Sequence, residues 1–358
     1  MNRFSLASAP AGGALLLMLS CGSITCSAGD TPQPCPEHQA SATHKSSSGG
    51  ELEGFALMVR IYFKPLPAKM PGSEADSPEC VALGRKLYFE RGLSQNKTQS
   101  CNDCHRLDGR QNGVDDLPTS KGADGTLGKR NAPTVLNAGF QLAQFWDGRA
   151  PDLAEQAKGP VLNPIEMGMR SPEEVVHRLQ DMPGYRRAFA AAFPGPREPL
   201  TYDNVARAIA AFERTLVTPA RFDRYLRGDR SALTREEERG LHRFVDTGCV
   251  DCHSSYTVGG RLFQKLGVYH PYSNQQDVGR REVTRQETDR LVFKVPMLRN
   301  VTRTAPYFHD GQVASLPEAV RLMAKMQLDV VLDQGAIDEI VKFLHSLEAE
   351  RPLDIPAT

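Results

Sequence analysis

Apolar residues recur at helical spacing in five stretches of the chain. Two of the stretches open with capping boxes, Ser171-Pro-Glu-Glu174 and Thr234-Arg-Glu-Glu237, in which the side chains satisfy the first free N–H groups of a helix. Stretches rich in Gly and Pro separate these segments. The sequence therefore predicts a mainly α-helical protein with little sheet. The predicted helices lie at about residues 78–92, 171–179, 205–216, 234–245 and 337–347.

The first residues have the pattern of an export signal. A short basic start, Asn2-Arg3, precedes an apolar run at residues 14–19 that is too short to cross a bilayer. Two processing routes fit the sequence, and it leaves both open: lipid attachment at Cys21, or cleavage after Ala28. No later segment is apolar enough to cross a membrane, so we expect a periplasmic protein that is soluble or tethered by a lipid.

Two Cys-x-x-Cys-His motifs carry the chemistry of the chain. In such a motif the two thiols add across the vinyl groups of haem, and the His becomes an axial ligand of the iron. A zinc site would draw the four cysteines into one cluster, and a dithiol oxidoreductase would not need a His beside each pair. We therefore expect two c-type haems. The motifs are Cys101-Asn-Asp-Cys104-His105 and Cys249-Val-Asp-Cys252-His253.

The two motifs also suggest how the chain is organised. A helix leads into a motif twice, and a long loop-rich stretch follows each time, which indicates a weak internal duplication. We therefore predict two cytochrome c-like domains, each around one covalently bound haem. Residues 31–50 are rich in Ser, Gly, Pro and His without periodicity, which is typical of a tether. The predicted parts are a signal segment (1–28), a flexible tether and N-terminal extension (29–77), an N-terminal domain (78–217) and a C-terminal domain (218–358).

The net charge of the chain limits the classes of partner that it can bind. The 43 basic residues balance the 43 acidic ones, so no overall field favours nucleic acid, and partners must be met through local patches.

Four of the eight cysteines lie in the haem motifs, and Cys21 and Cys26 lie in or beside the signal segment. Cys35 and Cys80 are left over. They could form a disulfide in an oxidising compartment, or stay free thiols.

The sixth ligand of each iron separates an electron carrier from an enzyme. An iron bound by both His and Met is saturated and passes electrons, whereas an iron with an open position can bind peroxide or oxygen. Residues after the second motif offer several candidate ligands for its iron. They are His270, Met297, His309, Met323 and Met326.

Further segments, spread in order along the chain, support a family resemblance. From about Pro78 to Pro352 the chain resembles the bacterial di-haem cytochrome c peroxidases and their relatives of the MauG type, which oxidise a partner protein. The matching segments are Leu117-Pro-Thr-Ser120, Gln144-Phe-Trp-Asp-Gly-Arg149, Glu155-Gln-Ala-Lys-Gly-Pro160, Glu166-Met-Gly168, Leu298-Arg-Asn300, Ala305-Pro-Tyr-Phe-His309 and Met323-Ala-Lys-Met-Gln-Leu328.

The resemblance implies peroxide chemistry at the N-terminal haem and electron entry at the C-terminal one. It makes Met323 the axial ligand opposite His253, and it places Trp146 between the haems as an electron bridge. Gln156 and Glu166 would face the open side of the first haem, where a carboxylate with an amide partner can move the proton that O–O cleavage requires. The resemblance also implies a calcium ion. Its ligands would be the Asn131 side chain and the carbonyls of Thr304 and Pro306.

One position departs from the family pattern. In many of these peroxidases a His shortly after the Leu-Pro-Thr-Ser segment caps the peroxidatic iron until the other haem is reduced. Ala123 stands at that place here, and no His occurs between His105 and His177. The first haem therefore has no evident distal ligand, as in MauG, although Met323 stands where MauG uses a tyrosine.

These observations give one expected function and two alternatives. We expect a periplasmic cytochrome c peroxidase that reduces hydrogen peroxide to water without reductive activation, taking electrons from a cytochrome c or a cupredoxin. A MauG-like oxidase of a protein substrate is the alternative enzyme, and a di-haem electron carrier is the alternative without catalysis. The sequence leaves a homodimer open.

Overall fold

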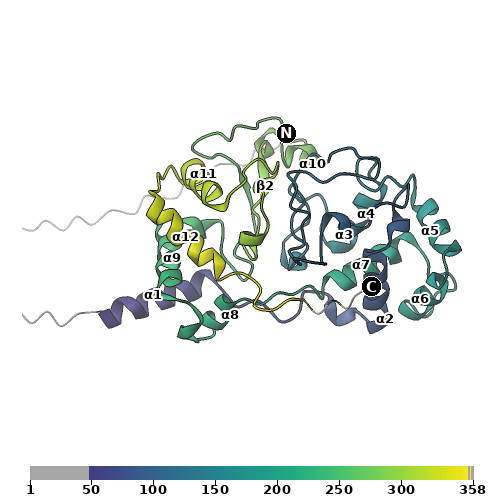
Figure 1. Cartoon of the computed structure of the whole chain (residues 1–358), viewed down its shortest axis with the longest axis horizontal. Coiled ribbons are helices and arrows are strands. Elements are labelled where there is room, and N and C mark those ends of the chain that lie inside the picture. The colour runs from purple at the N-terminus through teal and green to yellow at the C-terminus, as the bar shows by residue number, and fades with distance from the viewer. Residues whose placement is uncertain (1–47, 354, 356–358) are drawn as a thin grey trace, which may run out of the picture. The chain divides into compact units, whose positions relative to one another are not determined.

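The computed structural model describes residues 48–353 and 355, and this part of the chain is mainly α-helical with little sheet, as predicted (Figure 1). The predicted signal segment, both processing sites and Cys35 lie outside the described residues. Cys80 is a buried free thiol. Within the described ranges, no helix combines the length and the apolar character needed to cross a membrane.

Short helices joined by long loops make up the fold. Strands β1 (Phe263–Lys265) and β2 (Val292–Lys294) pair antiparallel, with Phe263 opposite Lys294. The helices are α1 (Ser48–Tyr62), α2 (Pro78–Tyr88), α3 (Cys101–Cys104), α4 (Leu153–Leu162), α5 (Pro172–Asp181), α6 (Tyr185–Ala192), α7 (Tyr202–Glu213), α8 (Arg221–Leu226), α9 (Arg235–Asp246), α10 (Arg281–Thr284), α11 (Leu316–Leu328) and α12 (Gln334–His345).

The predicted helices correspond to α2, α5, α7, α9 and α12, and the capping residues act as expected. The Ser171 side chain accepts a hydrogen bond from the backbone N–H of Glu174 at the start of α5. Thr234 and Glu237 form the full reciprocal capping box at the start of α9. Each cap satisfies donors that would otherwise have no partner within the helix.

Each half of the chain contains a pair of helices that cross in close contact, and one glycine makes each crossing possible. A Cβ atom on Gly84 of α2 would lie 1.7 Å from the carbonyl oxygen of Ala208 in α7. A Cβ atom on Gly240 of α9 would lie 2.0 Å from the carbonyl oxygen of Glu339 in α12. Only glycine allows backbones to approach this closely. Since α2 and α9 each precede a Cys-x-x-Cys-His motif, the two halves repeat one arrangement.

Two main hydrophobic cores follow this division, but each end of the described chain joins the core of the opposite half. The first core contains residues of α2 and α4–α7, and the second contains residues of α8, α9 and α12. Phe55, Val59 and Phe63 pack into the second core, whereas Leu353 and Ile355 pack against the first. The stretch 48–77, predicted within the tether and extension, thus contains a packed helix. The domain boundary at residues 217 and 218 stays a prediction.

Candidate functional site

The first motif forms a single helical turn that brings its three functional side chains together. The backbone N–H of Ser100 donates to the Asp103 carboxylate at 2.8 Å, and the Ser100 hydroxyl donates to it at 2.7 Å. The backbone N–H of His105 donates to the carbonyl of Cys101 at 2.9 Å, and the Tyr88 hydroxyl donates to the carbonyl of His105 at 2.6 Å. The loop before the motif and the core helix α2 therefore both hold the backbone that carries the imidazole.

The second motif opens onto a large cavity with mostly apolar walls. Its 3₁₀ turn, Cys249–Asp251, follows α9, and the backbone N–H of His253 donates to the carbonyl of Cys249 at 2.9 Å. Side chains of α9, α11 and α12 line the cavity together with Cys249, Cys252 and His253. The backbone also closes tightly on the imidazole, because a Cβ on Gly259 would lie 2.9 Å from His253 Nδ1 and 2.2 Å from the Pro296 carbonyl oxygen.

The protonation states of these groups fit haem attachment. Burial lowers the pKa of His253 to about 4 and lowers that of His105, so both imidazoles are neutral, as an iron ligand must be. Their Nδ1 atoms are buried. Burial raises the pKa of Cys249 to about 12 and that of Cys104 to about 11, so these thiols are neutral.

The spacing of the motifs does not favour the zinc alternative, because each pair of cysteines has its own His directly attached. In the described ranges, no group of three or more His, Cys, Asp or Glu side chains is arranged to hold a metal ion. Two thiols, a neutral imidazole and an apolar cavity are the surroundings that a covalently bound haem requires.

The structure separates the candidate ligands for the second iron. Met297, His309 and Met323 all line the cavity of the second motif. Met326 is buried in the neighbouring hydrophobic cluster, and His270 lies at the surface with its Nε2 2.6 Å from the Asp329 carboxylate. Met323 lies on α11, the helix that contains a matching segment of the family resemblance. Its assignment as the ligand of the second iron stays a prediction.

Trp146 lies in the wall of the same cavity and is held by main-chain atoms from both halves of the chain. Its indole Nε1 donates to the carbonyl of Asn131 at 2.9 Å, and its own carbonyl accepts from the backbone N–H of Lys294 at 2.7 Å. The ring meets the His309 imidazole edge-on, with 6.4 Å between the ring centres. The backbone N–H of Asn131 in turn donates to the carbonyl of His309 at 2.7 Å.

Glu166 is a half-buried carboxyl whose amide partner differs from the expected one. Asn163 Nδ2 donates to Glu166 Oε1 at 2.7 Å, so Asn163 takes the part expected of Gln156. The reason is local geometry, because the Glu166 N–H donates to the Asn163 carbonyl at 2.9 Å in a tight turn. Gln156 is half-buried on α4. Burial raises the pKa of Glu166, and Asn163 and then Arg149 act against this rise. The Asn-Pro-Ile-Glu spacing could have indicated this turn.

The segment that carries Ala123 is a short hairpin placed against Glu166. The Gly122 N–H donates to the Thr126 carbonyl at 2.8 Å, and the Ala123 N–H donates to the Glu166 carbonyl at 2.6 Å. A Cβ on Gly122 would lie 2.3 Å from the carbonyl oxygen of Ile165, so the two backbones are in close contact. Gln99, just before the first motif, donates to the Lys121 carbonyl at 2.9 Å. The hairpin therefore connects the first motif to Glu166.

The three residues expected to bind calcium all contribute to the wall of the same cavity. Asn131 Nδ2 donates to the carbonyl of Leu117 at 2.9 Å, which leaves the side-chain oxygen as an acceptor. The hydroxyl of Thr304 donates to the carbonyl of Val301 at 3.2 Å. The calcium site, with Pro306 as the third residue, stays a prediction.

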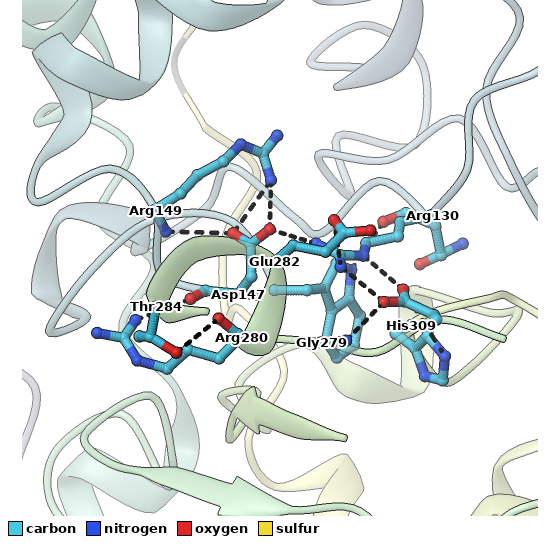
Figure 2. A network of polar contacts seen from close by, with 11 residues as sticks. Arg130, Asp147, Arg149, Gly279, Arg280, Glu282, Thr284 and His309 are labelled. Atoms are coloured by element: carbon cyan, nitrogen blue, oxygen red, sulfur yellow. Dashed lines mark hydrogen bonds and ion pairs between the residues drawn. The ribbon is translucent and has the colours of Figure 1, made fainter. Parts of the chain in front are cut away.

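A charge network next to Trp146 joins the two halves, and no local sequence pattern indicated it. Arg130 donates to the Asp277 carboxylate through Nε at 2.6 Å and Nη2 at 2.7 Å, and to Asp147 through Nη1 at 2.6 Å. Figure 2 shows Arg130 at the centre of this network, between Asp147 with Arg149 on one side and His309 on the other. Burial would raise the pKa of Asp277, but Arg130 brings it below its ordinary value.

Comparison with known proteins agrees with this arrangement. A family model described as "Di-haem cytochrome c peroxidase" matches residues 78–231. A cytochrome c551 peroxidase of Pseudomonas aeruginosa is 42% identical over 324 residues, 88% of this chain and 89% of that protein. One of Nitrosomonas europaea is 44% identical over 292 residues, 81% and 84% of the two chains. A solved MauG-like protein associated with microbial copper homeostasis has a TM-score of 0.68 and 29% identity, covering 79% of this chain and 93% of that one.

Proposed function

This chain belongs to the di-haem cytochrome c peroxidase family, and we propose that it reduces hydrogen peroxide to water with electrons from a small redox protein. The observation that carries the proposal is the similarity to two proteins named cytochrome c551 peroxidase, at 42% and 44% identity over more than four fifths of this chain. The proposed setting is the periplasm, with Cys21 as a candidate lipid anchor and the homodimer left open.

The proposed cofactors are two covalently bound haems, one in each of the domains 78–217 and 218–358. Cys101 and Cys104 would hold the first haem, and Cys249 and Cys252 the second. His105 and His253 would hold the two irons, with Met323 as a further ligand of the C-terminal iron, and Asn131, Thr304 and Pro306 would bind calcium. When bound, the haem irons supply the electrons that cleave the O–O bond of peroxide.

Glu166 is the proposed proton carrier. Its raised pKa, caused by burial, brings the carboxyl closer to neutral pH, where it can both accept and return a proton. Asn163 holds one carboxyl oxygen at 2.7 Å, so the other oxygen is available to a substrate. Gln156, on α4, would be a second amide of the site. A single carboxyl held in a fixed position, that of Glu166, would then protonate the peroxide.

Trp146 is the proposed connection between the two sites. Its contacts with Asn131 and Lys294 join a loop of the first half to β2 of the second. Electrons from a cytochrome c or a cupredoxin would enter at the second half and pass through this junction. Ala123 in place of a His implies that the first iron is open without prior reduction.

The alternative candidate is a MauG-like oxidase of a protein substrate. It is favoured by Ala123, since MauG-type members also lack the capping His, and by the likeness to a solved MauG-like protein. Met323 argues for the peroxidase, because the resemblance places a tyrosine there in MauG. A di-haem carrier would need both irons saturated by protein ligands.

The decisive test is steady-state turnover of hydrogen peroxide by protein matured with the c-type assembly machinery. Intact mass should show two haems, and the oxidised protein should contain a high-spin haem. Reduced cytochrome c or reduced cupredoxin should then be consumed at two electrons per peroxide. A variant with Cys101→Ser and Cys104→Ser is the control, since it should retain one haem and lose turnover. Two bound haems with no turnover by either donor would contradict the proposal.

A further inference from the structure

Lys294 is a buried lysine in the wall of the second cavity. It is the last residue of β2, and its side chain is 5% exposed. It lines the cavity together with His253 and Trp146, and its backbone N–H donates to the Trp146 carbonyl at 2.7 Å. The side chain thus lies at the junction where the two halves meet.

The protein supplies this ammonium group with no anion. Its Nζ donates to the side-chain carbonyl of Gln141, an uncharged partner, and within the described part of the chain Lys294 forms no ion pair. Burial alone lowers its pKa, to about 7. A buried charge is ordinarily paired, because removing it from water is costly.

The other residues of the cavity wall supply no anion for Lys294 either. Among the described residues that line the cavity, the lysines and arginines are Lys294 and Arg299, and there is no Asp or Glu. Arg299 is already paired with Asp223 through two hydrogen bonds, at 2.8 and 2.6 Å. Lys294 is therefore the cation of this wall for which the described residues supply no anion.

We propose that Lys294 is the partner of a carboxylate brought by the occupant of this cavity, namely a propionate of the second haem, and that its charge raises the reduction potential of that haem. The inference rests on the proposed haem at the second motif. A haem carries two propionate carboxylates and is otherwise apolar, which matches a cavity with apolar walls and one unneutralised cation. A fixed positive charge beside the haem favours the form that holds the extra electron.

The test is a redox titration of the second haem, without peroxide, in two charge-removing variants and one charge-retaining variant. Lys294→Met and Lys294→Gln should each shift the reduction equilibrium about tenfold towards the oxidised form, which corresponds to a potential lower by about 59 mV. Lys294→Arg should stay close to the parent protein. The control is Lys265→Met, an exposed lysine on the paired strand β1, which should change nothing.

Every outcome separates this inference from the proposed function. Two haems and an unchanged potential in Lys294→Met and Lys294→Gln would overturn the role of Lys294 and leave the peroxidase intact. Loss of the second haem in those two variants, with retention in Lys294→Arg, would support it, because Lys294→Arg keeps the charge that the other two variants remove. Loss in all three would show that packing of the lysine chain matters, and would overturn it. A parent protein with no haem at the second motif would refute the proposed function itself.

Discussion

Replacing Arg299 by methionine should destabilise the protein strongly, because it leaves a buried carboxylate without its charged partner. Arg299 and Asp223 are 1% and 0% exposed. Asp223 accepts two hydrogen bonds from the guanidinium, at 2.8 and 2.6 Å, and two from the backbone N–H groups of Leu66 and Ala220, at 2.6 and 2.8 Å. Breaking a buried ion pair from one side costs about 3–5 kcal/mol. Because the two backbone donors remain, we expect a loss of about 3 kcal/mol.

The measurement is urea unfolding of the haem-loaded protein, followed by far-UV circular dichroism. Asp223→Asn should also be destabilising, and the double variant should lose less than the sum of the two single losses, because it leaves no unpaired buried charge. Arg224→Met is the matched control, since Arg224 is 48% exposed and pairs at the surface with Asp229 and Glu350. It should change stability by about 0–1 kcal/mol. A single-variant loss below about 1 kcal/mol, or full additivity, would refute the reasoning.

Four further outcomes are expected. Glu166→Gln should lower kcat/KM for peroxide about 10²–10⁴-fold, the usual contribution of a general acid–base residue, without loss of haem. Met323→Ala should remove the sulfur-to-iron absorption band and lower the potential of the second haem in redox titration, whereas Met297→Ala should not. Ala123→His should convert the first haem to low spin and suppress the reaction of the oxidised protein with peroxide, as seen by stopped flow. Burial raises the folded-state pKa of Glu213 to about 8, from an ordinary value of 4.5. Its contribution to the free energy of unfolding is therefore complete below about pH 4.5 and lost towards pH 8, and Glu213→Gln should flatten that dependence in urea unfolding at several pH values.

Each of these has an outcome that would contradict it. Near-normal kcat/KM in Glu166→Gln would move the proton transfer to another group. Loss of the sulfur band in Met297→Ala alone would reassign the ligand. An unchanged spectrum in Ala123→His would mean that the hairpin does not lie over the iron. An unaltered pH dependence of the free energy of unfolding in Glu213→Gln would mean that another group causes it.

Features set by neighbours in sequence could be predicted, and those set by distant contacts could not. The capping boxes at Ser171 and Thr234 are local, so the starts of α5 and α9 follow from the sequence. α1 was not predicted, although Phe55, Val59 and Phe63 repeat every four residues, because a polar tract immediately before it favours a tether.

The same distinction holds at the candidate site. Each haem motif consists of only five consecutive residues, so the sequence alone predicts its chemistry. Arg130 and Asp277 are 147 residues apart, and nothing in either segment indicates the other. The position of Lys294 likewise depends on β2, a strand of three residues whose register is set by β1. Asn163 is different, because its turn with Glu166 is local and could have been anticipated.

The junction around Trp146 has a consequence for how such a protein can change over evolution. Three of its contacts use backbone atoms on at least one side: Trp146 to Asn131, Asn131 to His309, and Lys294 to Trp146. Substituting Asn131, His309 or Lys294 would leave these carbonyl and N–H groups present. Substitutions at these positions can therefore change the charge and polarity between the two haem motifs, while the backbone contacts keep the distance between the motifs the same.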